Sequence, residues 1–185
     1  MACSLACAKA GVRRSRHVLV VNVAAQKMTL FERMEPGVAF AGRFPQFHRR
    51  RAYLISTSRF GIGQLAGSNR TPLGLHRVAA KVGAGWPVGT VFRGRKPVGL
   101  TWGGLPEAPI AHRILWLDGL EMGWNRGGDC DSYSRYIYIH GVGNETTLGR
   151  PCSRGCIHMA AKDLMPLFDF LRPGTPVWIA GTGPR

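Results

Sequence analysis

The chain has 185 residues, of which 45% are hydrophobic and 19% charged, with 25 Gly and 12 Pro. This length suits one domain with its own core, and the composition excludes a disordered chain and favours a turn-rich β fold over a helical bundle. The excess of 25 Lys and Arg over 10 Asp and Glu gives a net charge of +15, which attracts a polyanion such as nucleic acid, anionic lipid or a carboxylate-bearing polymer.

Residues 1–16 are predicted to form a basic, flexible tail before a single domain at 17–181, and residues 182–185 a second tail. The first segment has small residues followed by arginines, so no signal peptide with the basic-then-apolar order is visible. No apolar run approaches the roughly 18 residues that a membrane helix needs. We therefore expect no transmembrane segment.

Dense basic runs occur at 13–16 ("RRSR") and 48–51 ("HRRR"). Neither run is interleaved with the aromatic residues of a nucleic-acid platform. We therefore expect no nucleic-acid partner.

The first predicted elements are a β-hairpin at 17–23 and 27–32, a surface excursion at 34–51 and a strand at 52–57. A glycine-rich loop, "GIGQLAG", follows and leads to Thr71-Pro72-Leu73-Gly74. It lacks the Lys-Ser/Thr of a phosphate-binding loop, so we interpret it as an ordinary flexible loop.

A Gly/Pro/Trp-rich loop is predicted near 83–112, and loops of this length usually bind a ligand or act as a lid. We expect Trp86 and Trp102 to be structural plugs rather than substrate contacts. Strands are predicted at 113–121 and 135–141.

The end of the chain is predicted to form a helix near 160–171 and then a last strand. Leu164, Leu167, Phe168 and Leu171 have the spacing of one helix face. Pro166 should shorten or kink this helix.

A histidine at a strand end and a cysteine sixteen residues later suggest nucleophilic chemistry. His140 would take the proton of Cys156, and the Gly141 carbonyl would fix the histidine tautomer. Gly155 lets backbone N–H groups around Cys156 face a developing oxyanion. Cys156 is also expected near the start of the final helix, whose dipole favours negative charge.

Two other interpretations of these residues remain open. Cys152, Cys156 and His158 form C-x3-C-x-H, and His140 or Cys130 would complete a four-ligand metal site. The spacing does not match a usual zinc finger or ribbon, and a Cys152–Cys156 disulfide is the second alternative. We expect no metal and no cofactor.

The segments "YIHG" (138–141) and "SRGCIHM" (153–159) resemble the L,D-transpeptidase catalytic domain (YkuD-type) of bacterial cell-wall enzymes, whose signature is His-Gly followed by Ser/Thr-x-Gly-Cys. The similarity extends in order over residues 17–180. It implies a mainly β fold, an antiparallel β-sandwich with one or two short helices. It also implies catalytic and substrate or oxyanion roles for a set of residues: Cys156, His140, Gly141, Ser153, Arg154, Gly155, Arg150 and His158.

Two positions depart from the family pattern. Arg154 stands where the family often has histidine, and His158 stands where it often has arginine. Arg150 or Arg154 is therefore expected to hold the substrate carboxylate.

The resemblance implies attack on a peptidoglycan tetrapeptide stem, release of its terminal D-alanine and a thioester on Cys156. Transfer to an amine gives a 3→3 cross-link or an attached protein or amino acid, and transfer to water gives carboxypeptidase activity. Carbapenem-type β-lactams are the expected covalent inhibitors. The family implies the periplasm or cell wall as the location, and because no signal peptide is visible a cytoplasmic location is the open alternative. An enzyme of this kind should hold one thiol that is alkylated fast at neutral pH. The rival function is a non-catalytic basic module that binds a polyanion or glycan on the same fold.

Overall fold

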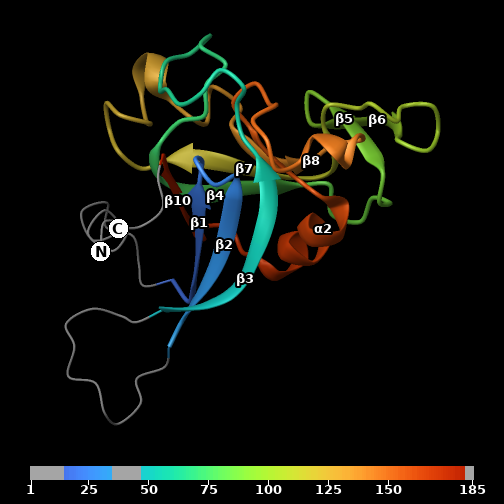
Figure 1. The fold of residues 1–185 in the computed structure, drawn as a ribbon. Helices are drawn as coiled ribbons and strands as arrows, with labels where there is room; N and C mark the ends of the chain where they lie inside the picture. The colour runs from blue at the N-terminus through green and yellow to red at the C-terminus, as the bar shows by residue number, and fades with distance from the viewer. Residues whose placement is uncertain (1–14, 35–46, 182–185) are drawn as a thin grey trace.

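The computed structural model describes residues 15–34 and 47–181, and a ten-stranded sheet dominates it (Figure 1). The strands are β1 His17–Asn22, β2 Lys27–Arg33, β3 Phe47–Ser56, β4 Gly74–Val82, β5 Thr90–Arg93, β6 Lys96–Leu100, β7 Ala111–Gly119, β8 Tyr138–Gly141, β9 Ile157–Met159 and β10 Pro176–Ala180. The described part also contains the α-helix α2 (Ala161–Phe170) and two 3₁₀ turns, η1 (Gly128–Cys130) and η2 (Glu145–Thr147). The mainly β prediction is confirmed.

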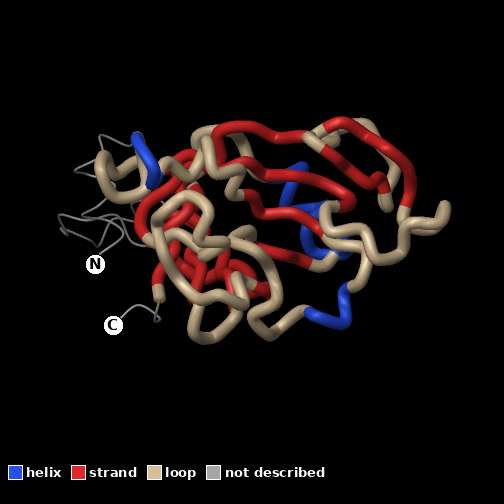
Figure 2. The backbone as a smooth tube through the Cα atoms, turned by 90° about the horizontal axis from the view of Figure 1, so that it is seen from above, coloured by secondary structure: helices blue, strands red, loops and turns tan. Residues whose placement is uncertain are grey.

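The sheet has the strand order β4-β10-β1-β2-β3-β9-β8-β7-β5-β6, and β4 also pairs with β7. This extra pairing closes the sheet into a barrel-like ring, and the β5–β6 hairpin extends beyond it (Figure 2). The β1–β10 and β8–β9 pairs are parallel, and the other pairs are antiparallel. The sheet is thus mixed and continuous, so the detail of a two-layered antiparallel sandwich is not confirmed.

The main core lies inside this ring, where the inward side chains of the strands meet α2. Leu164, Leu167 and Phe168 of the helix are buried there, as the predicted helix face requires. Pro166 has no N–H to donate to the preceding turn, yet it lies inside the helix and does not end it. The predictions of the first hairpin and the last helix are confirmed.

Two loop predictions need correction. Strand β3 begins at Phe47, so the basic run at 48–51 belongs to the sheet, while residues 35–46 lie outside the described residues. The segment near 83–112 contains the β5–β6 hairpin and the start of β7. Both segments expose most of their side chains, so they lack the alternating hydrophobicity that would have revealed strands.

Trp86 and Trp102 are not plugs, because they are 49% and 75% exposed. Of the predicted tails, the described residues include only Ser15 and Arg16. No helix in the described part is long and apolar enough to cross a membrane.

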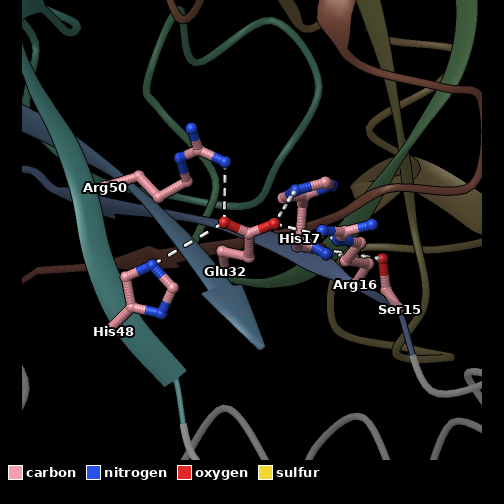
Figure 3. Close-up of polar contacts among 6 residues, drawn as sticks. All are labelled: Ser15, Arg16, His17, Glu32, His48 and Arg50. Carbon is pink, nitrogen blue, oxygen red and sulfur yellow. Dashed lines mark hydrogen bonds and ion pairs between the residues drawn. The ribbon is translucent and has the colours of Figure 1, made fainter. Parts of the chain in front are cut away.

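A single carboxylate organises basic residues at one end of the sheet (Figure 3). Glu32 accepts hydrogen bonds from Arg16 Nε at 2.9 Å and Arg50 Nη1 at 2.7 Å. The Nε2 atoms of His17 and His48 lie 3.4 and 3.7 Å from its carboxylate oxygens. We call these five residues the Glu32 cluster. Burial by itself raises the pKa of Glu32, but the two arginines outweigh it and lower this pKa to about 2.

Candidate active site

Strands β8 and β9 bring the predicted catalytic residues together. The two strands are parallel, with His140 opposite His158 and Ile139 opposite Ile157. Cys156 directly precedes β9, so it lies next to Tyr138, and its thiol donates to the Tyr136 carbonyl at 3.4 Å.

Cys156 therefore stands at a loop-to-strand junction and not near the start of the last helix. Strand β9 separates it from α2, which begins only at Ala161. Because a helix dipole acts mainly within its first turn, α2 gives the thiol little of the expected help.

The His140 ring is held in one orientation by its neighbour. Its Nδ1–H donates to the Gly141 carbonyl at 2.8 Å, and the side chain is only 2% exposed. A side chain at Gly141 would collide with the His112 ring and the Ala111 carbonyl, so this close approach requires glycine. The bond leaves Nε2 as the basic nitrogen of the neutral ring, and Nε2 has no hydrogen-bond partner among the described residues.

Burial keeps both members of this pair neutral. It raises the pKa of the Cys156 thiol to about 11, against the smaller lowering effects of the Tyr138 N–H and Arg135. Burial and then the nearby His158 lower the pKa of His140 to about 3. The described structure contains no hydrogen bond between the thiol and His140. The sequence predicts a thiolate and an imidazolium, whereas these shifted pKa values favour a thiol and an imidazole in the free protein near neutral pH.

His158 occupies the position where an arginine was expected, and it supplies no positive charge. Its ring centre lies 4.8 Å from that of His140. Burial lowers the pKa of His158 to about 4, so it too is neutral near pH 7.

The loop before the cysteine is braced by Ser153. Its hydroxyl donates to the Cys156 carbonyl at 2.6 Å and accepts from the Gly155 N–H at 3.2 Å. Gly155 has φ +117°, a conformation that side chains rarely adopt. The Gly155 N–H is therefore engaged inside the loop and is not free to face an oxyanion in this arrangement.

The two arginines predicted to hold the substrate are both exposed. Within the described part of the chain, neither Arg150 nor Arg154 forms an ion pair. Arg154 lines a cavity of about 290 Å³ together with Asp129, Arg135 and Ile137.

Sequence reasoning missed the buried anchor of the cysteine loop. Thr71 Oγ1 donates to the Gly155 carbonyl at 3.0 Å and accepts from the Ser58 N–H at 3.0 Å. Thr71 is fully buried. The segment Thr71-Pro72-Leu73-Gly74, which follows the glycine-rich loop, was the signal in the sequence that could have indicated this anchor.

An aromatic cluster next to the thiol was also missed. Trp116 stacks on Tyr133 with ring centres 4.0 Å apart, and Tyr138 meets Trp116 edge-on at 5.6 Å. Cys156 packs against a hydrophobic group that includes Trp116 and Tyr138. Phe92 of β5 belongs to the same group, so the β5–β6 hairpin adjoins the site.

The residues of the alternative metal site and of the alternative disulfide do not come together in the described part of the chain. Cys152 Sγ lies 3.6 Å from His158 Nδ1, while Cys130 donates to the Gly127 carbonyl. No three His, Cys, Asp or Glu side chains of residues 15–34 and 47–181 are placed to hold a metal ion. Cys130, Cys152 and Cys156 are all free thiols.

Comparison with known proteins gives one family and several solved structures. The model of the L,D-transpeptidase catalytic domain matches residues 16–179. Bd1075 from Bdellovibrio bacteriovorus is 16% identical, with a TM-score of 0.55 over 91% of this chain and 49% of that chain. The helical cell shape determining protein Pgp2 from Campylobacter jejuni is 13% identical, with a TM-score of 0.56 over 91% of this chain and 48% of that chain.

A third similar structure is the LD transpeptidase LdtMt1 in complex with imipenem. It is 15% identical, with a TM-score of 0.50 over 89% of this chain and 59% of that chain. At these identities the likeness shows the fold alone, and the chain spans about half the length of the first two structures. No curated protein sequence matches significantly.

Proposed function

The chain belongs to the L,D-transpeptidase catalytic domain family, and on that premise we propose that it is a cysteine acyltransferase acting on peptidoglycan stem peptides. The observation that carries this proposal is the His140 ring, fixed through Nδ1 by the Gly141 carbonyl on the strand beside a free cysteine. A nucleophile, its base and a group that orients the base are the three parts that such catalysis needs.

In the proposed reaction His140 Nε2 takes the thiol proton as Cys156 Sγ attacks the donor carbonyl. The imidazolium then gives this proton to the leaving amine, so that the terminal D-alanine departs and a thioester remains on Cys156. Attack by an acceptor amine, or by water, breaks the thioester and restores the thiol.

Because both groups are neutral in the free protein, we propose that proton transfer takes place with the donor bound. A donor that excludes water and places its carbonyl against the thiol allows the charge to form on the substrate oxygen instead of remaining on sulfur. The braced loop of Ser153 and Gly155 then has to shift slightly to offer a backbone N–H to that oxygen.

The remaining predicted residues hold the donor. We assign to Arg150 or Arg154 a carboxylate of the stem upstream of the scissile bond, because both guanidinium groups are exposed beside the cysteine loop and can form two parallel bonds. His158 packs against His140 and contributes shape rather than charge.

The proposed place of action is the periplasm or cell wall, where the stem peptides are, and the +15 charge favours a polymer that carries carboxylates. Carbapenem-type β-lactams are the proposed covalent inhibitors. Imipenem is bound to LdtMt1 and avibactam forms a carbamoyl enzyme with Ldtfm, both at TM-scores of 0.50 to this chain.

The test is intact-mass analysis after incubation with a carbapenem. We expect the mass of one carbapenem on the wild-type protein and none on Cys156→Ala. Cys152→Ala and Cys130→Ala serve as matched controls and should acquire the full adduct. An unmodified wild-type protein, or rapid labelling of Cys156→Ala at Cys152, would contradict the proposal.

A second candidate is the non-catalytic module that binds a polyanion or glycan. Two observations favour it: the neutral thiol without a hydrogen bond to His140, and the basic strand segment at 48–51. The same experiment separates the two functions, because a binding module forms no covalent adduct.

A further inference from the structure

One arginine in the turn of the β5–β6 hairpin packs against the body of the protein. Arg95 is half-buried, while Arg93 and Lys96 on either side of the turn are exposed. Its φ of +67° lies in the left-handed region that non-glycine residues seldom occupy. Gly94 has φ +55°, so the two residues form a two-residue hairpin turn, which requires positive φ at both positions.

Those contacts are with the aromatic cluster beside the thiol. The guanidinium carbon lies 4.6 Å from the centre of the Trp116 ring and 5.1 Å from that of Tyr136. Nη1 donates to the Tyr138 hydroxyl at 3.2 Å. Cation–π contact and this hydrogen bond fix the guanidinium plane, and most of its five N–H groups have no acceptor among residues 15–34 and 47–181.

The positive charge of Arg95 is not neutralised by any acidic residue of the described chain. Cys156 packs against the hydrophobic cluster that contains Tyr138 and Trp116, and both of these side chains also contact the guanidinium. The thiol also contacts the Tyr136 backbone, and Tyr136 carries the second ring below Arg95. An oriented cation without an acidic partner in the described chain therefore lies on the same aromatic cluster as the nucleophile.

We propose that Arg95 binds the C-terminal carboxylate of the donor peptide and so makes a free terminal carboxylate a condition of efficient acylation. This inference rests on the proposed function. The terminal carboxylate belongs to the leaving residue, about 3.8 Å along the chain from the scissile carbonyl. A donor carbonyl at Cys156 thus places this carboxylate over the rings that position Arg95.

The neighbouring basic groups do not supply this anchor. His158 is a neutral imidazole, and Arg150 and Arg154 are exposed residues of the cysteine loop. Arg135 already donates through Nη1 and Nη2 to the Gln64 and Arg70 carbonyls. Arg95 combines a fixed plane, partial burial and free N–H donors, the conditions for a two-bond grip on a carboxylate.

The test compares two donors, the tetrapeptide stem with a free terminal carboxylate and the same peptide as its terminal amide. Release of D-alanine or of D-alaninamide is measured for wild type, Arg95→Ala, Arg95→Lys and the control Arg93→Ala from the same hairpin. We expect Arg95→Ala to raise KM for the free acid about tenfold to a hundredfold, the range for losing a hydrogen bond to a charged group. The amide should be a poor donor for wild type and should lose no further activity in Arg95→Ala.

Arg95→Lys should recover part of the preference for the acid, because it keeps the charge, and Arg93→Ala should behave like wild type. An equal loss on both donors in Arg95→Ala would show a purely structural role and overturn the inference. Equal use of both donors by wild type would overturn it as well. Failure of wild type to release either product and to form any carbapenem adduct would overturn the proposed function with it, whereas adduct formation without preference for the acid overturns only the role of Arg95.

Discussion

The Glu32 cluster and the His140–Cys156 pair lie at opposite ends of the sheet. The cluster stabilises the charged form of its carboxyl group, whereas the candidate site stabilises the neutral forms of its thiol and imidazole. Glu32 remains charged because Arg16 and Arg50 bond its carboxylate and lower its pKa to about 2. Cys156 and His140 form no ion pair among the described residues, and burial outweighs the charge of Arg135 near the thiol, so that their pKa values shift to about 11 and about 3. Strand β3 connects the two regions, since His48 and Ser56 are separated by about 26 Å at ~3.3 Å per residue.

The difference teaches that ionisable residues alone do not reveal what a region does. In the Glu32 cluster the charges compensate each other near solvent, so the cluster holds together the ends of β1, β2 and β3. In the candidate site, Cys156 and His140 are both neutral, so the thiol becomes reactive only when a donor peptide is bound. Perturbed pKa values of this second kind are the ones associated with functional sites.

The largest expected effect is that of replacing His140. His140→Ala should slow acylation by a carbapenem about a hundredfold or more, because the thiol loses its base. The measurement is the rate of adduct formation by time-resolved intact mass. Glu32→Gln is the matched control at the other end of the sheet and should acylate at the wild-type rate. Equal rates for His140→Ala and wild type would exclude His140 as the base.

The second prediction concerns the free thiol. We expect Cys156 to react slowly with iodoacetamide at pH 7 and about tenfold faster for each pH unit above it, because its pKa is raised to about 11 and only the thiolate reacts. This reverses the expectation of fast alkylation that the sequence suggested.

The measurement uses a variant in which the other four cysteines are alanine, so that only Cys156 is alkylated. A second variant that keeps Cys130 as its single cysteine serves as the control. A plateau of the Cys156 rate that begins near neutral pH would mean that a thiolate–imidazolium pair already exists in the free protein.

The sequence was sufficient where one local pattern decides the structure. The alternation at 17–32 predicts the first hairpin, and the helical spacing of Leu164, Leu167 and Phe168 predicts α2. The contact between His140 and the Gly141 carbonyl was also predictable, because the two groups are adjacent in the chain.

Features that depend on distant parts of the chain were not predictable. The parallel β8–β9 pair and the ring closure of β4 on β7 join segments far apart in sequence. Strand β6 exposes both faces and β5 buries three consecutive residues, so neither strand of this hairpin shows alternation. The neutral state of Cys156 follows from burial, which the sequence does not specify, and from the position of β9 between the cysteine and the helix.

The third prediction tests the anchor of the cysteine loop. Thr71→Val keeps the shape but removes the hydroxyl, which leaves the Gly155 carbonyl and the Ser58 N–H unpaired in a buried place. We expect a loss of about 1–3 kcal/mol in the free energy of unfolding, measured by urea denaturation, and slower acylation of Cys156. Thr71→Ser, which keeps the hydroxyl, should retain most of the acylation rate. Full activity in Thr71→Val would show that Cys156 does not need this anchor.

The smallest expected effect is on acid stability in Glu32→Gln. The pKa of Glu32 is lowered from 4.5 to about 2, so its carboxylate contributes stability above pH 4.5 that is lost as the pH falls toward 2. The contribution is small because its partners Arg16 and Arg50 are 68% and 47% exposed and solvent screens their charges.

The pKa values of His140 and His158 are also lowered, from 6.5, so the stability of wild type and of Glu32→Gln should begin to fall already below pH 6.5. In urea midpoints measured from pH 7 to pH 3, Glu32→Gln should therefore lie slightly below wild type near neutral pH and approach it only below about pH 4.5. A gap that closes well above pH 4.5 would mean that protonation of Glu32 is not what removes this contribution.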